Sequence, residues 1–209
     1  MFLTYIVPLS ILIPILFGVL NFKTAKAGPK LLFYYLVASG LINLAAIIFI
    51  VYRMKNLPLL HLYTIVEAIL ILSYFRTLFT EPLIKKVLLY FTILFPILCI
   101  INFTFIQSIY TFNTYTRPLE AILITFFCLL YLYKSGFTEN WIQKPTSWFN
   151  IGILVYFPVV CIIFILSNYI VFVTKNKEMN LIIWYFHGAM SMIMYLAWGR
   201  GFSLIKNDR

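Results

Sequence analysis

Four ionisable side chains that could do chemistry lie inside apolar stretches of this 209-residue chain: Glu67, Glu120, His61 and His187. A charge inside hydrocarbon costs at least about 2.5–3.5 kcal/mol on insertion scales, so an ionisable residue at such a position indicates function. Glu67 is the strongest of the four, because it lies too deep for a short side chain to reach bulk water. We expect its carboxyl to be neutral, to pair with His187, or to accept a hydrogen bond from Tyr63 one turn earlier or from another helix.

Two kinds of chemistry suit these residue types. A carboxyl and an imidazole that share a desolvated site can exchange a proton near neutral pH, which favours proton-linked transport or pH sensing. The four residues could also bind a transition metal, since imidazole and carboxylate suit Zn, Mn or Fe, and the two histidines could ligate a haem. Their spacing selects no metal, because the sequence contains neither HExxH nor a pair of histidines four residues apart. The sequence therefore identifies no cofactor.

Each residue also has a purely structural explanation. Glu120 follows Pro118 by two residues, where a carboxylate is stabilised by the dipole of a helix start, with Arg117 as a partner at the membrane rim. His61 is expected near the interface as a hydrated rim residue. Glu67 could form an interhelical hydrogen bond that locks the helices together.

The composition requires a membrane around these residues. Hydrophobic residues make up 63% of the chain and charged residues 11%, whereas soluble domains carry about 25% charged residues. A chain of this size cannot bury so much apolar surface in water. The net charge of +10 would suggest nucleic acid in a soluble protein. In a membrane protein it reflects basic loops retained in the cytoplasm and attracted to anionic headgroups, so we expect the lipid bilayer and no nucleic acid as partner.

The elements that position these residues are apolar segments of membrane-spanning length. A helix needs about 20 residues to cross a hydrocarbon core of about 30 Å. Seven stretches have this length: 2–21, 31–52, 58–79, 87–107, 115–133, 148–173 and 181–198. We therefore predict an all-α, polytopic integral membrane protein, with residues 1–209 forming a single seven-helix transmembrane domain.

Basic residues between the spans predict the orientation. With the N-terminus outside, eleven fall on the inner side: Lys23, Lys26, Lys30, Arg76, Lys85, Lys86, Lys134, Lys144, Arg200, Lys206 and Arg209. Five fall outside: Arg53, Lys55, Arg117, Lys175 and Lys177. This asymmetry places the N-terminus outside and the C-terminus in the cytoplasm, and we expect a bacterial cytoplasmic (inner) membrane. Ala25-Lys26-Ala27 resembles a signal-peptidase site, but no basic n-region precedes it, so we expect the first span to be retained.

This orientation gathers the polar residues of the spans. The segments 58–79, 115–133 and 181–198 all start outside, so the four ionisable groups fall in the outer half of the membrane. We predict an outward-facing polar pocket built around Glu67 and His187. Its other lining candidates are Tyr63, Asn43, Asn102, Asn168 and Trp184.

We therefore expect the protein to bind or transport a small polar or ionic ligand, with proton linkage. One alternative is a sensor or assembly subunit that acts through a cytoplasmic or membrane protein partner, and another is an intramembrane metal- or haem-dependent enzyme. Enzymatic activity is the less favoured class. The sequence has no GxSxG, P-loop, GxGxxG or CxxC motif, and no predicted span contains an aspartate.

Overall fold

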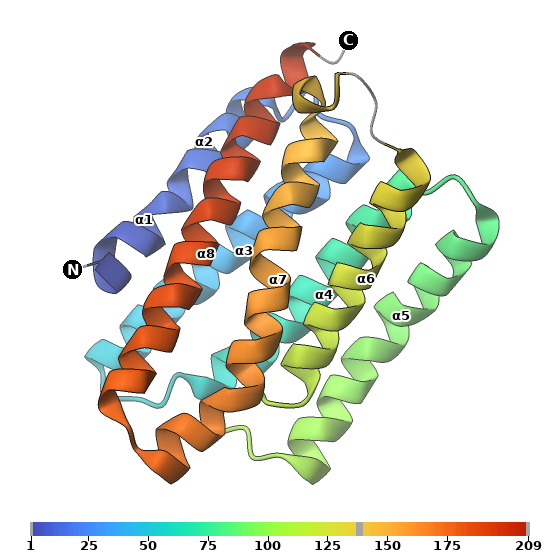
Figure 1. Ribbon diagram of the computed structural model, residues 1–209. Coiled ribbons are helices and arrows are strands. Elements are labelled where there is room, and N and C mark those ends of the chain that lie inside the picture. The colour runs from blue at the N-terminus through green and yellow to red at the C-terminus, as the bar shows by residue number, and fades with distance from the viewer. Residues whose placement is uncertain (1, 137–139, 208–209) are drawn as a thin grey trace.

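The computed structural model describes residues 2–136 and 140–207, which form a bundle of long helices running along one common axis (Figure 1). No strand occurs in these residues, so the all-α class is confirmed. The long helices are α3 (Ala27–Val51), α4 (Leu57–Leu78), α5 (Pro82–Ile101), α6 (Thr116–Ser135), α7 (Pro145–Asn168) and α8 (Lys177–Ser203). Shorter pieces are the π-helical turns η2 (Asn102–Ile106) and η4 (Tyr169–Thr174) and the 3-10 turns η3 (Trp141–Gln143) and η5 (Leu204–Asn207).

Six helices within the described residues are long and apolar enough to cross a bilayer, with η2 and η4 extending α5 and α7. Each coincides with a predicted span to within a few residues, because the prediction and the helices both follow the length of the uninterrupted apolar segments. These helices support an integral, multi-pass membrane protein.

The first predicted span differs from the other six. It is divided into the π-helical turn η1 (Phe2–Ile6), the single turn α1 (Val7–Ser10) and the helix α2 (Leu12–Asn21). The apolar helix that α1 and α2 form together is shorter than the other six, and two prolines fall in it, at positions 8 and 14. In Figure 1 the described chain begins beside the middle of α8. A seventh crossing and the orientation of the bundle therefore stay predictions.

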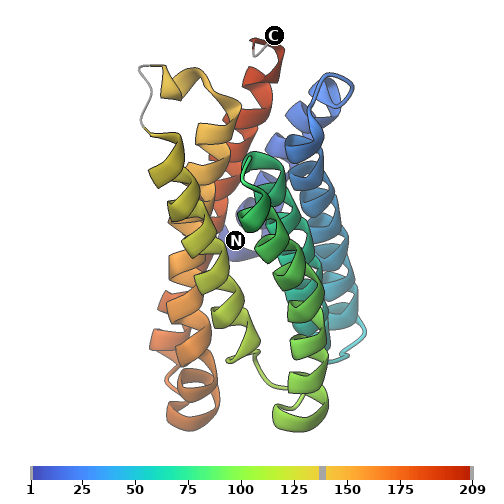
Figure 2. The same cartoon turned by 90° about the vertical axis from the view of Figure 1, so that its right-hand side faces the viewer.

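Six helices form a ring, and α5 lies outside it. Around the ring, α3 packs on α4, α4 on α6, α6 on α7 and α7 on α8, and α2 closes it against α8 and α3. Helix α5 packs mainly on α4, at one edge of the bundle (Figure 1), and Figure 2 looks onto this edge. We call the end where α4, α6 and α8 begin the lower end, and the end nearest the C-terminus the upper end, as they appear in Figure 1.

Interlocking aromatic rings fill the upper half of the ring. The Trp198 indole donates a hydrogen bond of 3.0 Å to the Phe149 carbonyl, and the Phe149 and Phe202 ring centroids are 4.9 Å apart. Glycines allow this approach. A Cβ atom added at Gly201 would lie 2.7 Å from the Phe149 ring, and one added at Gly152 would lie 2.6 Å from the Trp198 ring.

Candidate functional site

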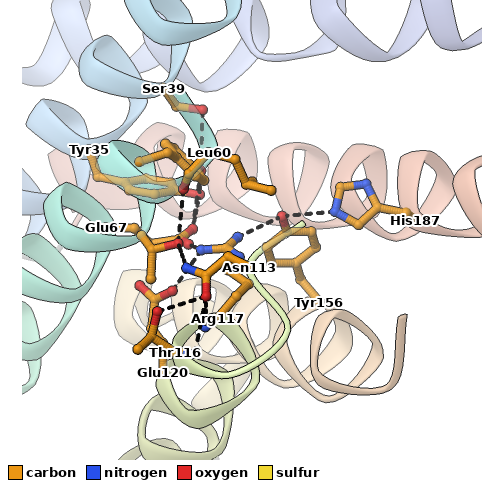
Figure 3. A network of polar contacts seen from close by, with 12 residues as sticks. Tyr35, Ser39, Leu60, Glu67, Asn113, Thr116, Arg117, Glu120, Tyr156 and His187 are labelled. Atoms are coloured by element: carbon orange, nitrogen blue, oxygen red, sulfur yellow. Dashed lines mark hydrogen bonds and ion pairs between the residues drawn. The ribbon is translucent and has the colours of Figure 1, made fainter. Parts of the chain in front are cut away.

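A buried charge cluster joins the middle of α4 to the first turns of α6 (Figure 3). Arg117 Nη1 forms an ion pair with Glu67 Oε2 and lies 2.7 Å from Glu120 Oε2. The three side chains are 1%, 0% and 1% exposed, respectively. One guanidinium therefore faces two carboxyl groups out of contact with solvent. We call these three residues the charge cluster.

Tyrosine hydroxyls complete the surroundings of Glu67. Its Oε1 accepts hydrogen bonds from the hydroxyls of Tyr35 on α3 at 2.8 Å and of Tyr63 at 3.1 Å. The two hydroxyls are themselves 2.6 Å apart, and Ser39 Oγ is 3.4 Å from the Tyr63 hydroxyl. The hydrogen bond expected from Tyr63 is thus present, and a second one comes from another helix.

The other side of Arg117 leads to α7 and α8. Its Nη2 donates to the Tyr156 hydroxyl at 3.4 Å, and that hydroxyl is 3.3 Å from His187 Nε2. The Arg117 Cζ atom lies 5.0 Å from the Tyr63 ring centroid and 5.6 Å from that of Phe164, in cation–π range. Its Nε has no hydrogen-bond partner among the described residues.

A local hydrogen-bond pattern fixes the start of α6 and so turns Arg117 inward. Asn113 Oδ1 accepts from the backbone N–H groups of Thr116 at 3.1 Å and Arg117 at 3.3 Å, which satisfies donors of the first helical turn. Its amide donates to Thr64 Oγ1 on α4 at 3.1 Å. Pro118 follows in the first turn, where a proline suits a helix. The start of α6 is thereby bound to α4 beside Glu67.

A cavity of about 520 Å³ adjoins the charge cluster in the lower half of the ring. Its polar lining includes Arg117, Tyr63, Tyr156, His187, Ser39 and Ser191. This volume falls in the range of about 300–1,000 Å³ that is typical of small-molecule sites. The arrangement offers a cation and several hydroxyls to a bound molecule, with two carboxyls directly behind the cation.

The predicted pocket needs one correction at its centre. His187 lines the cavity, but Glu67 is not among its lining residues, and the two groups are linked through Arg117 and Tyr156 and not paired directly. Arg117 itself was assigned by its sequence position to an outer loop, whereas it is buried. The physical reason is that two buried carboxyls need a cation, and Arg117 is the one that reaches both.

Of the other two predicted ionisable residues, Glu120 belongs to the charge cluster and His61 lies apart from it. Glu120 bonds Arg117, as a partner at the rim would, but it is fully buried. His61 lies apart from the cluster, with Nε2 3.1 Å from the Thr111 carbonyl oxygen. It is 1% exposed, so its expected position as a hydrated rim residue is wrong. Within 2–136 and 140–207, no three His, Cys, Asp or Glu side chains gather as metal ligands would, so His61, Glu67, Glu120 and His187 form no common ligand set.

Three of the five predicted lining candidates face the cavity: Tyr63, Asn43 and Trp184. Asn168 instead holds the loop before α6, because its amide group exchanges two hydrogen bonds of 3.0 Å with the backbone of Phe112. Asn102 lies beside a separate apolar groove between α5 and α6. Asn102 and Asn168 lie at the lower ends of α5 and α7, respectively, but neither is among the residues that line the cavity.

The sequence reasoning missed Arg117, Tyr35 and Tyr156 as members of the site. Arg117 had a usable signal, since an arginine at the start of a span that also contains a glutamate is a natural counter-ion. Tyr35 and Tyr156 had none, because the chain contains 15 tyrosines and most of them suit a membrane interface equally well.

Comparison with known proteins finds no matching family model, no significantly similar curated protein and no significantly similar solved structure. The class of protein is therefore defined by the molecule itself: a multi-pass helical membrane protein with a buried charge cluster beside a ligand-sized cavity.

Proposed function

We propose that this protein binds a small polar or ionic ligand in the cavity, transports it, and links binding to a proton held by the charge cluster. One observation carries the proposal: Arg117 is buried and ion-paired to Glu67 and Glu120, and it also lines the cavity. A ligand in the cavity would therefore contact the Arg117 guanidinium, which is ion-paired to two carboxyl groups on its other side.

The charge count of the cluster supports proton linkage. A guanidinium stays charged in proteins, so the cluster is neutral when one of its two carboxyls carries a proton. With both ionised it holds one excess negative charge out of water, and an uncompensated buried charge costs several kcal/mol. A ligand that changes the charge next to Arg117 therefore changes how many protons the cluster binds.

The proposed orientation puts the cavity on the outer side of a bacterial cytoplasmic membrane. The basic residues gather at the upper end of the bundle, which then faces the cytoplasm. Burial of Arg117 sharpens this asymmetry, because it removes one of the five basic residues counted at the outer side. Transport would carry the ligand inward from the lower end.

A cavity-filling substitution tests the binding site. Ala46 lines the cavity on α3, whereas its neighbour Ala45, also half-buried, is not among the lining residues. Purified protein is screened by thermal shift against small acids, amines and sugars. We expect a stabilising ligand for the wild type and for Ala45→Phe, and none for Ala46→Phe. Equal stabilisation of both variants would show that the ligand binds elsewhere.

The identified ligand then tests the proton linkage and transport. The double variant Glu67→Gln with Glu120→Gln removes both titrating carboxyls and should abolish the pH dependence of ligand binding and of uptake into proteoliposomes, whereas Glu67→Gln alone leaves Glu120 to take the proton. Circular dichroism checks that each variant is folded. An unchanged pH dependence would contradict the proposed role of the cluster. Binding without uptake would instead favour the sensor that the sequence allows.

A further inference from the structure

We infer that the ligand is a single-chain amphiphile with an anionic carboxylate head, drawn from the membrane, and that one proton enters the charge cluster with each anion. This inference rests on the proposed function and specifies its substrate class.

Arg117 selects for an anionic head. The carboxyls of Glu67 and Glu120 lie behind the guanidinium, so a ligand meets the positive group first. A guanidinium carries five N–H donors. Nη1 faces the two glutamates and Nη2 donates once to Tyr156, which leaves the Nε–H and one Nη2–H. The Nε–H shares one edge of the planar group with an Nη2–H, and a carboxylate binds such an edge through both oxygens, so a bound carboxylate would satisfy the buried Nε–H.

Charge balance gives the proton count. A bound monoanion adds one negative charge beside a cluster that is neutral with one protonated carboxyl. Neutrality returns when the second carboxyl takes a proton from the aqueous phase, so one proton is bound per anion and no net charge is buried. The titratable groups that face the cluster from the packed helices are Tyr35 on α3, Tyr63 on α4, Cys99 on α5, Tyr156 on α7, and His187 and Tyr195 on α8.

The rest of the cavity suits an alkyl chain. Besides Arg117, its walls include aliphatic and aromatic side chains from five helical elements: Leu3, Val7, Ile42, Ala46, Leu60 and Phe164. A head bound at Arg117 would leave its chain among these residues. A ligand without an apolar chain would leave that surface uncovered and would lose the free energy of burying it.

Asn43 marks an entrance from the membrane. It lines the cavity and is exposed on α3, eight residues before the helix ends, which is about 12 Å at helical rise. The nearby Leu41, Leu44 and Ile47 are exposed apolar side chains, as expected of a surface in contact with lipid chains. A polar amide at this depth is costly against hydrocarbon but favourable beside a passing carboxylate. We therefore assign the mouth of the cavity to the Asn43 side of α3.

Four probes that differ in one feature each test the inference. Decanoate, decanol and decylamine share a chain and differ in the head, and butyrate keeps the acid and loses the chain. Binding to the full-length protein in nanodiscs is measured by calorimetry at pH 7, in two buffers of different ionisation enthalpy, with empty nanodiscs subtracted. We expect decanoate to bind about tenfold or more tighter than decanol and decylamine, since hydrogen bonds to charged groups contribute about 1.5–3 kcal/mol. It should also bind more tightly than butyrate, which lacks the apolar chain. The binding enthalpy of decanoate should differ between the two buffers by the difference in their ionisation enthalpies, which corresponds to one proton taken up per ligand.

Contrary outcomes are distinct. Tighter binding of decylamine or decanol would contradict an anionic head group. Butyrate binding as tightly as decanoate would contradict a ligand drawn from the membrane. Decanoate binding without proton uptake would contradict the uptake of one proton with each anion. Ala46→Phe should abolish decanoate binding, and Ala45→Phe should leave it unchanged. If decanoate fails but the screen finds another ligand that Ala46→Phe excludes, this inference fails and the proposed function survives. If no ligand is sensitive to Ala46→Phe, both fail.

Discussion

The two halves of the helical ring are filled differently by the same helices. In the upper half, Phe149, Trp198 and Phe202 interlock at glycine positions. In the lower half, the charge cluster and its tyrosines border a cavity. The contrast separates two tasks, because close packing fixes the positions of the helices while hydrogen-bonded polar groups leave room for a ligand. Substitutions in each half therefore have different expected costs.

The largest effect is expected at Arg117. Arg117→Gln leaves two carboxyls buried without their cation, which should lower the free energy of unfolding in detergent by about 3–5 kcal/mol. The double variant Glu67→Gln with Arg117→Gln removes one of the orphaned carboxyls and should recover part of this loss. Chemical denaturation followed by circular dichroism measures both. If Arg117→Gln were as stable as the wild type, the ion pairs would not contribute to the stability of the bundle.

The upper half should resist even one added methyl group. Gly201→Ala would bring Cβ within 2.7 Å of the Phe149 ring, and overpacking of this kind costs about 1–3 kcal/mol. Gly40→Ala on α3 is the matched control, because, apart from its chain neighbours and the backbone of its own helix, no atom of the described residues lies within 4 Å of the position of its Cβ. We expect the control to be neutral or to gain up to about 1 kcal/mol of helix propensity. Equal thermal stability of the two variants would contradict the dense packing at Phe149.

Tyr63 in the lower half and Tyr74 in the upper half differ in the hydrogen bonds of their hydroxyl groups. The Tyr63 hydroxyl contacts Glu67, Tyr35 and Ser39, so Tyr63→Phe should cost about 1 kcal/mol. The buried Tyr74 hydroxyl, near the upper aromatic core, has no hydrogen-bond partner among the described residues. Tyr74→Phe should therefore be neutral or stabilising. A larger loss of thermal stability for Tyr74→Phe than for Tyr63→Phe would contradict this prediction.

The smallest effect is expected for an exposed ion pair between the last turn of α6 and the loop that joins α4 to α5. Lys134 Nζ lies 2.7 Å from Glu81 Oε1, and this hydrogen bond lowers the pKa of Glu81 from its ordinary value of 4.5. A lowered folded-state pKa contributes stability above the unfolded value, and that contribution is lost as pH falls through the folded value. Lys134→Met should therefore lower the unfolding temperature slightly at pH 7 and not at all well below pH 4.5. A difference that grows on acidification would reverse the sign of the interaction.

The sequence predicted the six long helices well, because apolar length alone determines where a chain can span a bilayer. The first predicted span is less regular, since it has a break at Ile11 and prolines at positions 8 and 14, and its crossing of the bilayer stays a prediction. Apolar composition does not distinguish a full crossing from a shorter helix packed along its neighbours.

The sequence does not show in which direction the side chains of the candidate site point. Glu67 and His187 both lie in the polar region, yet spans that are apolar all round carry no periodicity to show which way each residue points. The placement of Arg117 failed for a related reason. Charge counting by loops assigns a residue at the start of a span to water, and only the contacts of α4 with α6 show that it turns inward.

The packing of α2 against α8 has a consequence for synthesis. These helices come from opposite ends of the described chain, so α2 leaves the ribosome well before its main neighbour exists. Until α8 has been inserted, the nascent chain lacks both a wall of the cavity and the His187 imidazole, and the early segment must remain in the lipid or the insertion machinery. The candidate site can therefore assemble only late in biogenesis.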